Sequence, residues 1–156
     1  SVAHASGLLP DLAEVGDTYD QIVQTVLAHA EPGGRSPMAL RTWFDLLATR
    51  TRIRAQLRTL FTQFDAVLCP AAGCAAFEHV IEPNLEKRLL TIDGKAAPYG
   101  ALAAWAGLAS LGGLPATVAP AGSTADGLPL GVQIVGPYFE DRSTLALASL
   151  LAESAV

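Results

Sequence analysis

The chain has 156 residues, of which 51 % are hydrophobic and 16 % charged, and its formal net charge is −5. This length suits one domain with a single core, and so apolar a composition excludes intrinsic disorder. The acidic balance predicts no nucleic-acid partner, since such partners need a dominant basic surface. The mean hydropathy of +0.35 is high for a chain in which no apolar run approaches the ~20 residues of a membrane-spanning helix. We therefore predict no membrane association.

Signals for targeting, metals and cofactors are weak in the sequence. Residues Ser1 to His4 lack a basic region followed by an apolar one, so we expect no signal peptide and take the cytoplasm as the default location. The missing initiating Met indicates a processed or excised chain. Cys69 and Cys74 lack the spacing of zinc or redox motifs and are expected to be buried thiols, with a disulfide as the alternative. No histidines stand one helical turn apart, so we predict no metal and no cofactor.

Helical periodicity and capping residues predict two helices in the first part of the chain. After an irregular lead-in over residues 1–16, Asp17 is expected to cap a helix that ends at Ala30. A second helix is predicted from Pro37 to about Gln63, with Ser36 as its cap. The buried stripe of this second helix is expected to consist of Leu46, Ile53, Leu57, Leu60 and Phe64.

Three arginines, Arg50, Arg54 and Arg58, stand one turn apart on another face of the second helix. A long exposed helix often carries such a row, so we interpret it as a solvated face or as partners of nearby carboxylates. An anion clamp is the alternative interpretation.

Short apolar runs bounded by Pro, Gly or Asp-Gly predict the strands. They cover residues 65–70, which end at Pro70, then 116–119, which end at Pro120, and 131–136. Turns at Asp93-Gly94 and Asp126-Gly127 indicate a small hairpin and a pair of antiparallel neighbours. A small-residue helix is predicted over 99–111, and Asp141 is expected to cap the last helix. Strands that are apolar on both faces favour an α/β fold with a mixed β-sheet covered by helices.

Composition and spacing identify no active site. A nucleophilic hydrolase needs a Ser, Cys or Thr beside a base that accepts its proton. Ser110 lacks the flanking glycines of a nucleophile elbow. Lys87 and Lys95 lie in polar surroundings where a lysine stays protonated. We assign no catalytic residue to the chain, and a hydrolase using Ser110 with Lys95 is the weakest of the alternatives.

Several blocks of the sequence resemble the C-terminal part of amidase-signature enzymes. Their order and spacing also agree with that family, and the resemblance covers most of residues 37–156. We therefore interpret residues 1–156 as one C-terminal segment of a larger domain, with a lead-in and helix over 1–35 and a family-like region over 36–156. The blocks are Asp65-Ala-Val-Leu-Cys-Pro70 after an Arg-rich helix, Trp105, Gly113-Leu-Pro-Ala-Thr-Val-Ala-Pro-Ala-Gly122, and Asp126-Gly-Leu-Pro-Leu-Gly-Val-Gln-Ile-Val-Gly136.

The resemblance implies an incomplete portion of the α/β/α amidase fold, and hydrolysis of carboxylic amide C–N bonds by a Ser–Ser–Lys triad without a cofactor. In that family the triad lies N-terminal of the region resembled here, so none of its residues is carried over onto this chain. The chain is therefore expected to be inactive alone. Ala103 and Gly107, four residues apart on one helix face, are expected to line the acyl-binding channel, with close helix packing as the alternative.

An incomplete sheet exposes strand edges and apolar faces, and both promote association. We expect the chain to bind the missing N-terminal portion of its parent enzyme or to self-associate, and a small amide substrate to bind only in the complete enzyme. The alternative from another class of function is a non-catalytic binding or interaction domain derived from the amidase fold.

Overall fold

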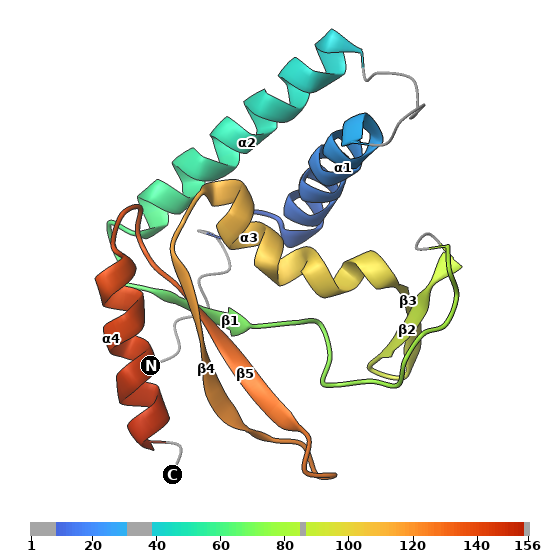
Figure 1. Ribbon diagram of the computed structural model, residues 1–156. Coiled ribbons are helices and arrows are strands. Elements are labelled where there is room, and N and C mark those ends of the chain that lie inside the picture. Colours follow the sequence, from blue (N-terminus) through green and yellow to red (C-terminus); the bar gives the residue numbers. More distant parts are fainter. Residues whose placement is uncertain (1–8, 31–38, 85–86, 155–156) are drawn as a thin grey trace.

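The computed structural model describes residues 9–30, 39–84 and 87–154 as helices, strands and connections around one small sheet (Figure 1). The predicted α/β class is confirmed. In chain order the elements are α1 (Leu12–Ala30), α2 (Leu40–Leu60), β1 (Val67–Pro70), β2 (Leu89–Ile92), β3 (Lys95–Pro98), the 3-10 helix η2 (Tyr99–Ala103), α3 (Ala104–Gly112), β4 (Ala116–Ser123), β5 (Pro129–Val135) and α4 (Asp141–Ser154).

Helix α1 begins five residues before the predicted cap. The carboxylate of Asp11 accepts a hydrogen bond from the backbone N–H of Ala13 at 2.9 Å, which is the contact expected of an N-cap. The prediction of Asp17 as the cap is therefore wrong. The added first turn carries Val15, which is fully buried, so packing against the core extends the helix. Ser36 and Pro37, the predicted start of the second helix, lie outside the described residues.

The main sheet has the strand order β1-β5-β4, and both of its pairings are antiparallel. Cys69 and Val118 both pair with Gln133, which places them on one face of the sheet. Leu68 and Thr117 both pair with Ile134 and lie on the other face. The mixed pairing expected from the sequence is thus not found among these three strands, because a parallel neighbour is not among them.

Two turns decide how the strands pair. Asp93 and Gly94 have φ angles of 51° and 73° between β2 and β3, which is the left-handed geometry of a two-residue hairpin turn. The predicted hairpin is confirmed. Strand β4, by contrast, continues beyond Pro120 through a register shift between Pro120 and Gly122, so the predicted end at Pro120 is wrong. A proline is tolerated there because β4 is an edge strand.

Helices cover both faces of the sheet in part (Figure 1). On one face, Ala109 of α3 packs with Cys69 and Val135. On the other face, the hydroxyl groups of Thr117 in β4 and Thr144 in α4 lie 2.9 Å apart and are hydrogen-bonded. The sheet is therefore the middle layer between α3 and α4.

The largest buried cluster lies where α1, α2 and α3 meet. It contains most of the predicted α2 stripe, whereas Phe64 lies beyond the end of α2 and is half-buried. The three helices bury one another's apolar faces at this junction. The buried members of the cluster are Val15, Ile53, Leu57, Leu108 and Leu111.

The arginine row on α2 makes contacts within the protein. Arg50 Nε donates to the backbone carbonyl of Leu111 at 3.0 Å, at the C-terminal end of α3. The guanidinium of Arg54 lies 5.5 Å from the centroid of the Tyr138 ring. Arg58 is exposed. The first two members of the row thus connect α2 to neighbouring segments through a carbonyl and a ring rather than through carboxylates.

We predict that Leu57→Ala lowers the free energy of unfolding by about 2–5 kcal/mol, because Leu57 is 1 % exposed and its loss leaves a cavity among three helices. The control is Leu40→Ala on the same helix, which is 69 % exposed and is expected to change stability by less than about 0.5 kcal/mol. Urea unfolding of both variants measures the difference, and equal losses would contradict this core.

Candidate functional site

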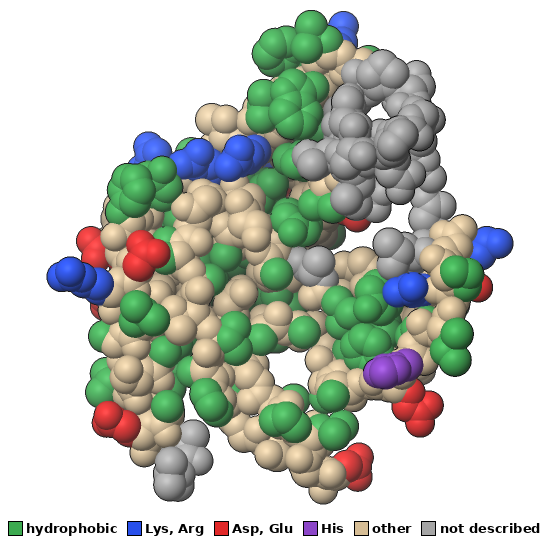
Figure 2. Space-filling model, viewed as in Figure 1, with side chains coloured by type: hydrophobic (Ala, Val, Ile, Leu, Met, Phe, Trp, Pro, Cys, Tyr) green, Lys and Arg blue, Asp and Glu red, His purple; other side chains and the backbone are tan. Residues whose placement is uncertain are grey.

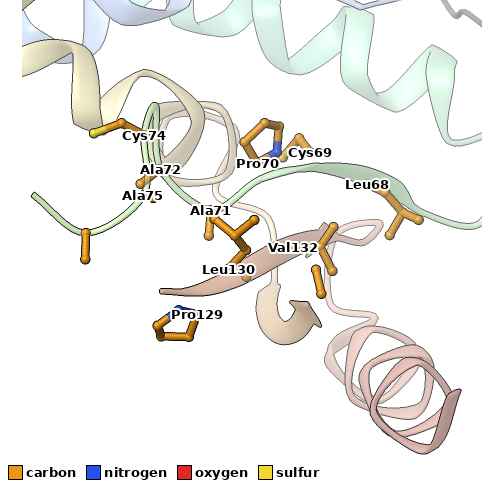
Figure 3. A pocket seen from close by; sticks show the side chains of 13 residues that line it. Leu68, Cys69, Pro70, Ala71, Ala72, Cys74, Ala75, Pro129, Leu130 and Val132 are labelled. Atoms are coloured by element: carbon orange, nitrogen blue, oxygen red, sulfur yellow. The ribbon is translucent and has the colours of Figure 1, made fainter. Parts of the chain in front are cut away.

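The candidate site is an open apolar groove of about 650 Å³ along β1, β5 and the loop that follows β1 (Figure 3). None of the residues that line it carries a formal charge. In Figure 2 the surface is hollowed beside the β4–β5 hairpin. Such a lining suits an apolar occupant. The groove is lined by Leu68, Cys69, Pro70, Ala71, Ala72, Cys74, Ala75, Ala76, Ala121, Pro129, Leu130, Gly131 and Val132.

The groove exists because α4 covers only part of its face of the sheet. Helix α4 packs mainly on β4, and Ala119 and Ile134 on that face are buried. Leu68 lies on the same face in β1 and is 57 % exposed. Figure 3 shows Leu68, Val132 and Leu130 spread along β1 and β5 beside α4. One sheet face therefore has a covered half and an open half.

The thiol of Cys69 belongs to the opposite, covered face of the sheet. The side-chain Nε2 of Gln133 lies 3.3 Å from Cys69 Sγ and donates to the backbone carbonyl of Trp105 at 3.1 Å. Burial raises the pKa of the Cys69 thiol, and the hydrogen bond from Gln133 opposes that effect. Because the thiolate is the nucleophile, a thiol of raised pKa is a poor one. Cys69 and Cys74 are both free thiols, as expected, and Cys74 is only half-buried.

The structure does not bring Ser110 and Lys95 together. Ser110 is exposed in the last turns of α3, and Lys95 is exposed at the start of β3. Figure 1 shows that end of α3 and the β2–β3 hairpin on different sides of the molecule. Direct proton transfer needs heavy atoms about 2.6–3.2 Å apart, so these two residues do not form a nucleophile–base pair.

The described residues contain no group of three or more His, Cys, Asp or Glu side chains that could hold a metal ion. The same residues contain no helix with the length and apolar character needed to cross a membrane.

Gly107 is buried where α3 crosses α1. A Cβ atom built on Gly107 would lie 3.3 Å from Cβ and Cγ of Tyr19, so the missing side chain allows the two helices to approach closely. Ala103 is the last residue of η2, and its side chain lies outside what the structure describes. The contact with Tyr19 accounts for Gly107 by helix packing, and a role for Ala103 and Gly107 in lining a channel stays a prediction.

The groove was not predicted from the sequence. The segment 71–76 is simply a run of small residues after a strand, and such a run has many uses. The available signal was the apolar character of both faces of β1, since Leu68 and Cys69 point to opposite sides of the sheet.

The layered sheet and the covering helices define a part of a larger α/β domain, and comparison with known proteins identifies the family. The amidase family model matches residues 20–145, so the chain belongs to the amidase family. Its relatives include one of the subunits of the glutamyl-tRNA(Gln) amidotransferase, which is 33 % identical over 106 residues in Maricaulis maris and 34 % identical over 110 residues in Xanthobacter autotrophicus. Each match covers 68 % of this chain and 20 % of the relative.

Solved structures of larger proteins share this fold. A crystal structure of an amidase matches with a TM-score of 0.74 and 24 % identity, over 93 % of this chain and 36 % of the amidase chain. The corresponding glutamyl-tRNA(Gln) amidotransferase subunit from Thermotoga maritima matches with a TM-score of 0.59 and 24 % identity, over 72 % of this chain and 22 % of that chain. The chain thus spans about a fifth of the curated relatives and about a third of the amidase structure.

We predict that Gly107→Ala makes the chain less stable than Gly100→Ala by about 1–3 kcal/mol, because only the first added methyl group meets a packed neighbour. A Cβ on Gly100 meets no atom within 4 Å. Urea unfolding compares the two variants. If Gly107→Ala is as stable as Gly100→Ala, the close packing on Tyr19 is contradicted and an open channel wall is favoured.

We also predict that the free energy of unfolding falls as the pH rises above the ordinary range of a cysteine. The pKa of the Cys69 thiol is higher in the folded state, so its stabilising effect is complete below about pH 8.5 and is lost as the pH rises through the folded pKa. Urea unfolding at about pH 7.5 and about pH 9.5 should show a larger decrease for the wild type than for Cys69→Ala. Equal decreases would contradict the assignment to Cys69.

Proposed function

We propose that this chain is the C-terminal portion of an amidase-type hydrolase that acts on carboxylic amide C–N bonds. In this proposal the chain completes the sheet and the acyl-binding channel, and the nucleophile and its base come from the rest of the amidase domain. The chain is inactive alone and works with that missing portion or, as a second possibility, associates with itself.

The observation that carries the proposal is the sheet that is open at β1. Among the described residues β1 has one strand neighbour, β5, and the face of β1 is uncovered at Leu68. An amidase-family sheet with an uncovered face and an unpaired edge is not a finished domain. The shares of the relatives that the chain covers, 20 % and 36 %, support the same interpretation.

The contacts of α3 support a role in positioning. Gln133 ties the start of α3 to the sheet through the carbonyl of Trp105, and Arg50 holds the last turn of the same helix through the carbonyl of Leu111. A helix fixed at both ends can form one rigid wall of a binding channel, because its position does not depend on the rest of the domain. The chain therefore supplies shape to the proposed site, whereas the reacting groups are supplied elsewhere.

One observation favours the second candidate, a non-catalytic binding domain. The groove is apolar and lacks formal charge, which is compatible with holding a partner without chemistry. The coding sequence upstream discriminates between the two candidates. A reading frame that continues upstream into a Gly/Ser-rich segment preceded by a Lys supports the hydrolase portion, and its absence favours the binding domain.

We predict that the purified chain does not hydrolyse aliphatic or aromatic carboxamides above the rate in buffer, because its exposed Ser110 has no base beside it. Ammonia release is the measurement, and Ser110→Ala is the matched control. Turnover by the wild-type chain that disappears in Ser110→Ala would contradict the proposal and establish the chain as a hydrolase in its own right.

A further inference from the structure

The groove beside α4 has the properties of a docking surface. Its floor is formed by strand residues that α4 does not reach, among them Leu68 and Leu130. On the same face Ile134 is fully buried where helices cover it. Figure 3 shows that the open area continues from β1 onto β5 without a charged side chain. Covering this area would bury apolar surface without removing any charge from water.

The strand edge next to the groove indicates what kind of occupant fits. The outer side of β1 has no strand neighbour within the part of the chain that the structure describes, so its backbone N–H and C=O groups are available for pairing. A small apolar molecule in the groove would leave these groups without a protein partner. A polypeptide segment can cover the apolar floor and also pair with the edge.

The sizes of the relatives distinguish between two polypeptides, a second copy of this chain and the rest of an amidase domain. Most of this chain, 93 %, superposes on 36 % of an amidase chain, so the larger part of that domain has no counterpart here. A two-fold dimer would instead place the same groove against itself, and two hollows that face each other leave the floor uncovered. The remainder of the domain is the occupant that the observations favour.

We propose that this groove, formed by β1, β5 and residues 71–76, receives an apolar segment of the N-terminal remainder of the amidase domain. The proposal rests on the proposed function and specifies its partner surface. The incoming segment covers Leu68 and Leu130 and pairs with the free edge of β1. Cys74, which lines the same groove and is half-buried, becomes shielded when the segment binds.

Thiol modification tests the proposal without added labels, because both cysteines of the chain line the groove. The probe is the matched Maricaulis maris amidotransferase polypeptide from which the 106 aligned residues have been deleted, and affinity capture measures its binding. A disulfide reagent modifies the thiols, and peptide mass spectrometry separates Cys74 from Cys69. We expect the probe to slow the modification of Cys74 by about tenfold or more, since thiol reactivity follows exposure.

The matched variants are Leu68→Asp in the groove and Leu145→Asp on α4. Both leucines are 57 % exposed, so both variants are expected to fold, which circular dichroism checks. The probe should protect Cys74 in Leu145→Asp and fail to protect it in Leu68→Asp. If Leu68→Asp does not fold, Leu130→Asp replaces it on the same face of the sheet.

Three results would overturn the proposal: capture of the probe without protection of Cys74, no capture of the probe, or protection that appears when the concentration of this chain alone is raised. The last result would assign the groove to a second copy. None of these measurements uses turnover. A complex that protects Cys74 but does not hydrolyse amides contradicts the proposed hydrolase and leaves the docking surface intact.

Discussion

The pairing of β5 with strands on both of its sides holds the layers of this structure together. β5 binds β1 on one side and β4 on the other, and its residues alternate between the two helical layers. Gln133 reaches the first turn of α3 through the carbonyl of Trp105. Its neighbour Ile134 is fully buried on the α4 side. Without β5 neither the groove nor the position of α3 would be defined.

The apolar composition of the chain is explained by the same incomplete sheet. Large hydrophobic side chains such as Leu68, Val118 and Ile81 are exposed at 57 %, 57 % and 90 %. Single exposed apolar residues are normal on a protein surface, but Leu68 and Val118 lie on opposite faces of a sheet whose equivalent positions are otherwise covered. A chain that needs a further layer has a higher mean hydropathy than a chain that is complete in itself.

Much of the fold could be predicted from local sequence patterns, because those patterns act over a few residues. The Asp93-Gly94 hairpin follows from backbone geometry, and the α2 stripe from Leu46 to Leu60 follows from helical periodicity. The start of α1 could not be predicted, since Asp11 and Asp17 are both good capping residues and the burial of Val15 decides between them. The groove could not be predicted either, because it depends on where α4 ends its coverage, and that is a tertiary property.

The irregularity in β4 has a consequence for how the sheet can be extended. Pro120 offers no backbone N–H, and the shift of register that follows it twists the strand out of line with any straight neighbour. That border is a poor template for another strand, whereas the border at β1 contains a proline only at its last position, Pro70. The sheet therefore has a terminated side and a receptive side, and it can grow in one direction only.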